Sequence, residues 1–146
     1  MILDLSSILP QDHPMIMVDK LISSTENSIV VEATIKNSYP FTTESIGTWI
    51  GLEFMAQSAA VLANLDGKKE FGLGFLLGCR KFVSNVSQFT PGQNILISIN
   101  IELPDRTSPL VSAFGVIKDK LGEVICEASL TLYEPKDDGL YLSNEA

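Results

Sequence analysis

The residues best suited to acid–base chemistry in this chain of 146 residues are one glutamate and one histidine. Glu53 is the only ionisable residue between Glu44 and Asp66, and most of its neighbours are apolar. A carboxyl group in apolar surroundings is costly to ionise, which makes it a candidate general acid or base. His13 is the only histidine, and imidazole is the side chain best suited to move protons near neutral pH.

Both residues also have a structural interpretation. Glu53 shares one stripe of a helical pattern with Gln57, Ala60 and Asn64, and such a stripe can simply face water. His13 lies in a polar turn between two prolines, where a histidine commonly hydrogen-bonds to its own loop. The residues alone therefore leave both a solvated stripe and a proton-transfer site open.

The element that must position Glu53 is a predicted helix over residues 47–67, about five turns long. Thr48 is suited to cap its beginning, and Gly67 is suited to end it. Apolar side chains fall on nearly every face of this helix. A helix of that kind is normally surrounded by protein, so we expect it at the centre of the fold.

Alternating or β-branched apolar residues predict five strands, over residues 27–36, 71–83, 95–102, 110–118 and 123–133. Two further segments are predicted with less definite structure, a short amphipathic turn or helix over residues 2–9 and a short apolar segment over residues 15–18. This order predicts the α+β class, with an antiparallel sheet curved around one long central helix. Gly72, Gly74 and Gly78 inside a predicted strand indicate a bulge, a close approach by a ligand, or tight packing on the helix.

Length and composition predict a single domain over residues 1–146, with a core over about residues 7–134 and a tail over residues 135–146. The net charge of −8 argues against binding to nucleic acid or to an anionic membrane. No long apolar run and no secretory signal occur, so we expect a cytoplasmic protein without a membrane span. Cys79, Cys126 and the single histidine form no metal-ligand pattern, so we expect reduced thiols and no metal site.

Three motifs resemble the hotdog-fold dehydratases that act on 3-hydroxyacyl groups carried by acyl carrier protein. They are ILPQDHPMIMVD at residues 8–19, LEFMAQ at residues 52–57 and FTPGQ at residues 89–93. The likeness covers about residues 7–134. Two segments, WIGLEFMAQ at 49–57 and GFLLGCR at 74–80, are similar to the subgroup found with aryl-polyene and related pigment clusters.

The resemblance implies a reaction and assigns roles to residues. Water leaves a 3-hydroxyacyl thioester held on phosphopantetheine, with no cofactor bound by the enzyme itself. Glu53 matches the family's helix carboxylate, whereas Gln11 occupies the position of the family's histidine and His13 lies two residues further on. The loop over residues 37–47 lacks the histidine that typical members hold before the helix. We expect Glu53 and His13 to share the acid–base work.

The resemblance also implies substrate contacts. The backbone N–H groups near Thr48 and Trp49, at the start of the helix, would stabilise the enolate-like oxygen of the thioester. Trp49, Phe54, Phe75 and Leu76 would line an apolar acyl tunnel, although each could equally fill the interior. Gln57 and Gly78 complete the expected set of substrate-binding residues, Thr48, Trp49, Gln57, Phe75 and Gly78.

The partners implied are acyl carrier protein and a second hotdog subunit, identical or different, with the acyl tunnel at the shared face. Lys68, Lys69, Arg80 and Lys81 could form a basic patch for the acidic carrier, or could simply be solvated charges. Two alternatives stay open: a catalytically silent subunit of a hetero-oligomer, and an acyl thioesterase that uses the same carboxylate to activate water.

Overall fold

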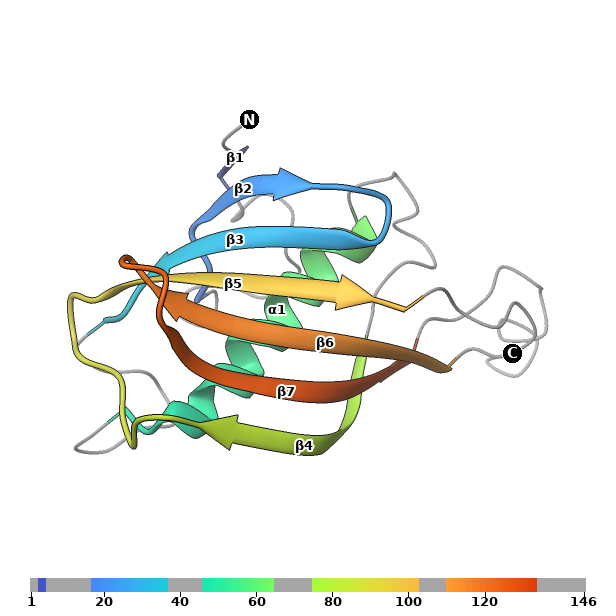
Figure 1. Cartoon of the computed structure of the whole chain (residues 1–146). Helices are drawn as coiled ribbons and strands as arrows, with labels where there is room; N and C mark the ends of the chain where they lie inside the picture. Colours follow the sequence, from blue (N-terminus) through green and yellow to red (C-terminus); the bar gives the residue numbers. More distant parts are fainter. Residues whose placement is uncertain (1–2, 5–16, 37–45, 65–74, 103–109, 134–146) are drawn as a thin grey trace, which may run out of the picture.

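In the described part of the protein, one helix packs on one face of a curved antiparallel sheet (Figure 1). The computed structural model describes residues 3–4, 17–36, 46–64, 75–102 and 110–133. This arrangement confirms the predicted α+β class and the hotdog fold. Several predictions fall outside the described residues: those for His13, Gly67, Lys68, Lys69, Gly72 and Gly74, for residues 15–16, and for the tail over residues 135–146.

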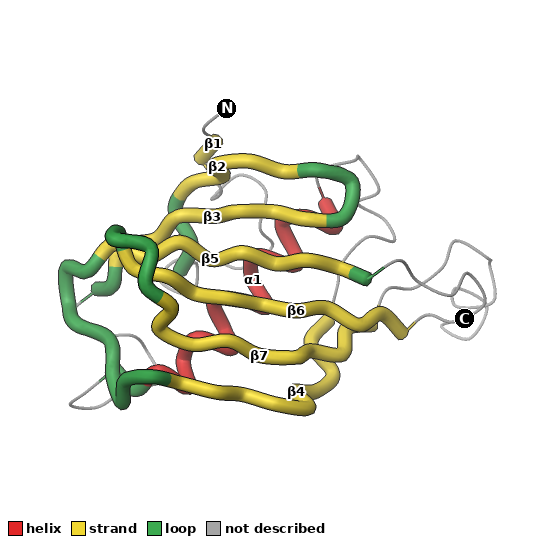
Figure 2. Tube along the Cα trace, in the orientation of Figure 1, coloured by secondary structure: helices red, strands yellow, loops and turns green. Residues whose placement is uncertain are grey.

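The strands of the described residues are β1 (Leu3–Asp4), β2 (Lys20–Ser24), β3 (Ser28–Thr34), β4 (Phe75–Ser84), β5 (Asn94–Ile101), β6 (Leu110–Asp119) and β7 (Val124–Tyr133). They form one sheet in the order β1-β2-β3-β5-β6-β7-β4, and every neighbouring pair is antiparallel. The chain therefore leaves β3 near one side of the sheet, runs through the helix, and enters the opposite edge as β4. Figure 2 shows the helix crossing behind the strands.

Hydrophobic alternation explains why the predicted strands are correct. In β3 and β5 the buried residues face each other across the ladder, with Ile29 opposite Ile99, Val31 opposite Ile97 and Ala33 opposite Ile95. A period of two places all of them on the face that covers the helix. The hairpin predicted at residues 119–122 is also present, with Gly122 at a φ of 89°.

The N-terminal strands differ from the sequence-based prediction. β1 lies within residues 2–9, where a turn or helix was expected, and β2 was not predicted at all. Only Leu21 of the five residues of β2 is buried, so the segment offers almost no apolar alternation. Met17 and Val18, in the apolar segment over residues 15–18, are buried and lie outside any strand.

The central helix begins later than predicted. A single 3-10 turn covers Thr48–Ile50, and α1 then extends over Gly51–Asn64. The N-cap of this turn is Gly47, and Thr48 lies inside the turn, so the predicted cap is wrong. The protein also does not surround the helix completely within one chain, because the Trp49 side chain is 57% exposed.

Close approach between helix and sheet depends on two glycines, one on the sheet and one at the start of α1. A Cβ atom at Gly115 of β6 would lie 2.7 Å from the Met55 sulfur, and one at Gly51 would lie 3.0 Å from the Cys126 sulfur. Phe54 packs edge-to-face on Phe89 with ring centroids 5.9 Å apart. Phe54 is fully buried, so it belongs to the core and not to an accessible tunnel.

Gly78 does not serve to allow a close approach between β4 and the helix. Its Cβ position has no atom within 4 Å, so the helix does not press on it. The pairing of β4 with β7 shifts register between Leu76 and Gly78, and again between Cys79 and Lys81. Of the interpretations offered by the sequence, the bulge is the one confirmed at Gly78.

Candidate active site

The start of the helix is held against the segment that follows β4. The Thr48 N–H donates to the Ser87 carbonyl at 3.2 Å, and the Thr48 hydroxyl donates to the Val86 carbonyl at 3.0 Å. The Ser84 hydroxyl approaches both the Thr48 hydroxyl, at 2.8 Å, and the Val86 carbonyl. Thr48 is buried, and its donors are used within the protein. The expected oxyanion donor at the Thr48 N–H is therefore occupied in this structure.

Glu53 lies on the first turn of α1, and its side chain is partly buried, so it contacts both the protein and the solvent. One carboxylate oxygen, Oε2, accepts a hydrogen bond of 3.2 Å from the Gln57 amide nitrogen one turn later. A spacing of four residues along a helix places two side chains on the same face, which makes this contact possible. The carboxylate therefore has one oxygen held by the protein, while the group still reaches the exterior.

Gln57 is fully buried, which rules out the interpretation of its stripe as a solvated face. Its Oε1 atom accepts a hydrogen bond of 2.8 Å from the Met17 N–H, which covers this side of the helix. Ala60, further along the same stripe, is also buried at 6% exposure. Two hydrogen bonds thus link Met17 to Gln57 and Gln57 to Glu53, and Glu53 is the most exposed residue of the three.

The surroundings of Glu53 on the outer face of the helix are apolar. Trp49 precedes it by one turn and is exposed, and Leu52 and Ala56 beside it are partly buried. The Trp49 ring lies against Gly47, where a Cβ atom would come within 2.4 Å of the indole nitrogen. The exposed indole therefore presents an apolar surface on the turn that precedes Glu53. It does not fill the interior of the chain, contrary to the core interpretation.

The structure brings Glu53 and Gln57 into contact on α1 and places Trp49 on the 3-10 turn that precedes them. Gly78 lies on the edge strand β4, and the side chain of Phe75 on the same strand is outside the described residues, as is that of Leu76. The contact that sequence reasoning missed is the Met17 N–H. The spacing of four residues between Glu53 and Gln57 gave a partial signal for it. A buried amide that contacts Glu53 at one end needs a second partner at the other end.

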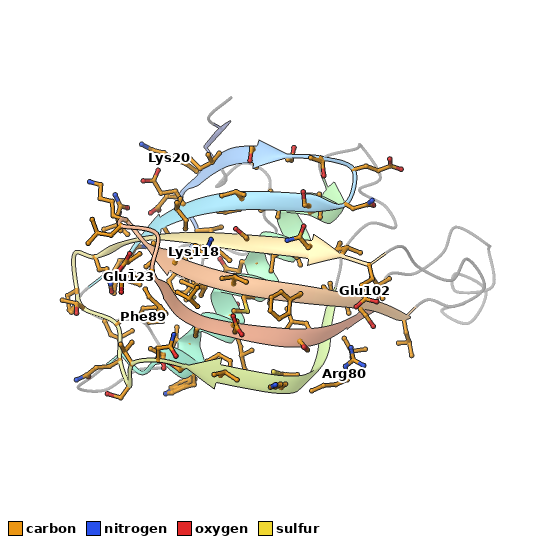
Figure 3. All side chains as sticks on the ribbon, in the orientation of Figure 1. Lys20, Arg80, Phe89, Glu102, Lys118 and Glu123 are labelled. Carbon is orange, nitrogen blue, oxygen red and sulfur yellow. The ribbon has the colours of Figure 1, made fainter. Side chains whose placement is uncertain are left out.

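Two exposed cations of the expected basic patch lie on β4. Figure 3 shows Arg80 projecting from this strand at the edge of the sheet, and its guanidinium approaches the Ser112 hydroxyl at 3.5 Å. Lys81 follows directly and is also exposed. The pairing of β4 with β7 shifts register between Cys79 and Lys81, at the position of Arg80.

The described ranges contain no cluster of three or more His, Cys, Asp or Glu residues that could hold a metal ion. No helix within them combines the length and apolar character that crossing a bilayer requires. Cys79 and Cys126 are both free thiols. Burial, with a smaller contribution from the Glu127 carboxylate, raises the pKa of the Cys126 thiol from 9.0 to about 12, so it stays protonated and unreactive.

A hotdog domain with a helix carboxylate defines a class that includes dehydratases and thioesterases. The chain belongs to the ApeP-like family, described as ApeP dehydratase, whose family model matches residues 3–143. It is therefore a dehydratase-like lyase by family. No curated protein matches the sequence.

One solved structure agrees with this assignment, and two others share the fold. A chain of the dehydratase heterocomplex ApeI:P from Xenorhabdus doucetiae is 26% identical, with a TM-score of 0.78, and the match covers 99% of each chain. Zebra fish thioesterase superfamily member 2 is 13% identical, with a TM-score of 0.67, 89% of this chain covered and 92% of that one. The E. coli PaaI protein of the phenylacetic acid degradation operon is 12% identical, with a TM-score of 0.62, 78% of this chain covered and 81% of that one. The last two likenesses show the fold alone.

Proposed function

We propose that this protein dehydrates 3-hydroxyacyl thioesters carried on acyl carrier protein, in the cytoplasm, during the synthesis of a polyene pigment. The observation that carries the proposal is the placement of Glu53: a partly buried carboxylate on an apolar, outward-facing part of α1, with one oxygen held by a buried amide. The protein needs no cofactor of its own, because the acyl group arrives attached to phosphopantetheine.

The reaction requires two proton transfers. A base removes the proton from C2 of the acyl chain, and an acid protonates the hydroxyl group that leaves C3 as water. Each correctly placed proton transfer contributes about 10²–10⁴-fold to the rate. Glu53 supplies one partner, and the hydrogen bond from Gln57 fixes the orientation of its carboxylate so that the other oxygen can meet the substrate.

His13 is the proposed second partner, and the hydrogen bond at Met17 supports this assignment. The Met17 N–H donates a hydrogen bond to Gln57, which lies one turn from Glu53. His13 precedes Met17 by four residues in the sequence. Four residues span at most about 14 Å when fully extended. The covalent chain therefore limits how far the backbone of His13 can lie from Met17 and its contact with Gln57.

A second hotdog subunit is the proposed partner for the face of α1 that the chain leaves open. The ApeI:P structure is a heterocomplex, and the Trp49 side chain beside Glu53 is 57% exposed in a single chain. β4 lies at the edge of the sheet, with a further strand on only one side among the described residues. Such an edge can accept another strand. Arg80 and Lys81 on that strand are candidates for contact with an acidic carrier protein.

One experiment separates the proposed activity from its alternatives. The protein is incubated with a 3-hydroxyacyl group on acyl carrier protein, alone and with a second hotdog dehydratase subunit, and the products are followed by mass spectrometry. A loss of 18 mass units, about one water, supports the dehydratase. Release of free phosphopantetheine thiol would instead identify a thioesterase.

A catalytically silent subunit is the second candidate, and one observation favours it. Gln11 occupies the position at which the family has its histidine, so the chain departs from the family at a reacting group. In that case the incubation shows dehydration only when the partner is present, and the rate does not change when Glu53 is replaced by glutamine. Dehydration by this protein that depends on Glu53 contradicts the silent role.

A further inference from the structure

We propose that Gln57 is a positioning residue that couples the segment around Met17 to the carboxylate of Glu53. The proposal rests on the proposed function of Glu53, and it assigns to Gln57 a role distinct from substrate binding. Gln57 would act only through Glu53, by fixing where one carboxylate oxygen lies. The seating of the Met17 segment would in turn fix the Gln57 amide.

The contacts of Gln57 give the coupling its direction. The amide is fully buried and bridges two elements that are 40 residues apart in sequence. Its Oε1 accepts from the Met17 N–H at 2.8 Å, and its Nε2 donates to Glu53 Oε2 at 3.2 Å. Met17 and Glu53 thus hold opposite ends of one rigid planar group.

The chemistry of the two ends leaves only one orientation of the amide. A backbone N–H can only donate, so the Gln57 oxygen must face Met17. The nitrogen, which can only donate, is then directed to Glu53. Reversing the amide would place two donors against each other at Met17 and would direct an oxygen toward a carboxylate. Displacing the Met17 segment would remove this constraint and release the carboxylate.

Burial makes the arrangement costly to leave incomplete. A buried polar group without a partner loses the hydrogen bonds it would have in water, so both ends of Gln57 must stay paired. A residue needed only to fill the space would more simply be leucine or methionine, which have a similar volume. The polar side chain therefore indicates that the two connections themselves matter.

The test compares Gln57→Met, which removes the hydrogen bonds to Met17 and Glu53, with Gln57→Glu, which keeps the shape and an acceptor for Met17. The matched control is Ser58→Ala, because Ser58 is equally buried on the same turn but donates to the Phe54 carbonyl at 2.8 Å, away from Glu53. Turnover of a 3-hydroxyacyl thioester is measured with the complete chain and its partner subunit. Without substrate, the hydrogen-exchange rate of the Met17 amide and the ¹³C shift of the Glu53 carboxyl are recorded.

We expect Gln57→Met to lower kcat by about 10–100-fold with little change in KM, since misplacing a reacting group by about 1 Å has effects of that size. The Met17 amide should exchange at least about tenfold faster, and the Glu53 carboxyl signal should move. Ser58→Ala should leave all of these within about twofold. A Gln57→Met variant that behaves like Ser58→Ala would overturn the proposal.

Gln57→Glu tests the proposal through the pH dependence of activity, which a merely structural role would not change. This variant also replaces the methionine variant as the test if the latter fails to fold. Two carboxylates at this separation share one proton at low pH, so the new acid can still donate to Glu53. At higher pH that proton is lost, and residue 57 can then no longer donate a hydrogen bond to Glu53. Activity of Gln57→Glu should therefore fall relative to the wild type as pH rises, and identical pH profiles would contradict the coupling.

The failure of this proposal can be distinguished from the failure of the proposed function. If the wild-type protein does not dehydrate the substrate, but Gln57→Met still moves the Glu53 signal and speeds exchange at Met17, the coupling stands and the proposed reaction is wrong. If the wild-type protein is active and neither readout responds to Gln57, the coupling is wrong and the reaction stands.

Discussion

Replacing Gly115 by alanine inserts a methyl group into the contact between the sheet and the helix that carries Glu53. The new Cβ atom would lie 2.7 Å from the Met55 sulfur, 3.1 Å from Met55 Cγ and 3.2 Å from Ile99 Cδ1. Heavy atoms pack best at about 3.5–4.0 Å, so the nearest contact must open by roughly 1 Å. Met55 is flexible and can absorb part of this change, so we expect a loss of about 1–2 kcal/mol in the free energy of unfolding.

Equilibrium unfolding in urea measures this loss, and Gly78→Ala is the matched control. The Cβ position at Gly78 has no atom within 4 Å, and its φ is not among the positive values, so alanine there should change stability by less than about 0.5 kcal/mol. Adding Met55→Ala should cost less in the Gly115→Ala background than in the wild type, because the clash is relieved. A Gly115→Ala protein as stable as the wild type would refute the reasoning about this contact.

Two further predictions concern the support around the site. Thr48→Val keeps the shape but removes the hydrogen bonds of the Thr48 hydroxyl with the Val86 carbonyl and the Ser84 hydroxyl, which still contact each other. It should reduce the unfolding free energy by about 0.5–1.5 kcal/mol, whereas Thr48→Ser should not, and urea unfolding compares them. At pH 8 a thiol reagent should modify the partly exposed Cys79 before the buried Cys126, as mass spectrometry of the labelled protein would show, and equal rates would contradict the burial of Cys126.

The raised pKa of Cys126 also gives a pH dependence of stability. The folded protein holds this proton more tightly than the unfolded chain, so the stabilisation is complete below pH 9 and is lost as the pH rises toward 12. Urea midpoints should therefore decline more steeply above pH 9 in the wild type than in Cys126→Ala. Parallel curves would contradict the cause that we assign to burial.

The strands could be predicted because each carries its burial pattern in its own residues. Ile95, Ile97 and Ile99 show alternation that no helix would tolerate, and the structure buries all three. β2 could not be predicted, because its pairing with β3 is fixed by the neighbouring strand and only Leu21 contributes to the core. A short polar strand acquires its structure from its partner.

Within the site, the sequence located the carboxylate but not its environment. The i to i+4 spacing placed Gln57 beside Glu53, whereas the burial of Gln57 depends on Met17, which is distant in sequence. The exposure of Trp49 could not be predicted from the sequence either. An apolar helix has the same residue pattern whether all of its faces pack on its own chain or one of them packs on another subunit. Long-range contacts, not local propensity, decide both points.

The most direct test of the account is the turnover of Glu53→Gln with a 3-hydroxyacyl group on acyl carrier protein, measured in the presence of the partner subunit. Glutamine keeps the size of the side chain but can neither accept nor deliver the proton. We expect a loss of at least about 100-fold, while unfolding in urea and the rate of the Ser58→Ala control stay close to the wild type. Turnover of Glu53→Gln within about twofold of the wild type would contradict the central claim that this carboxylate performs the chemistry.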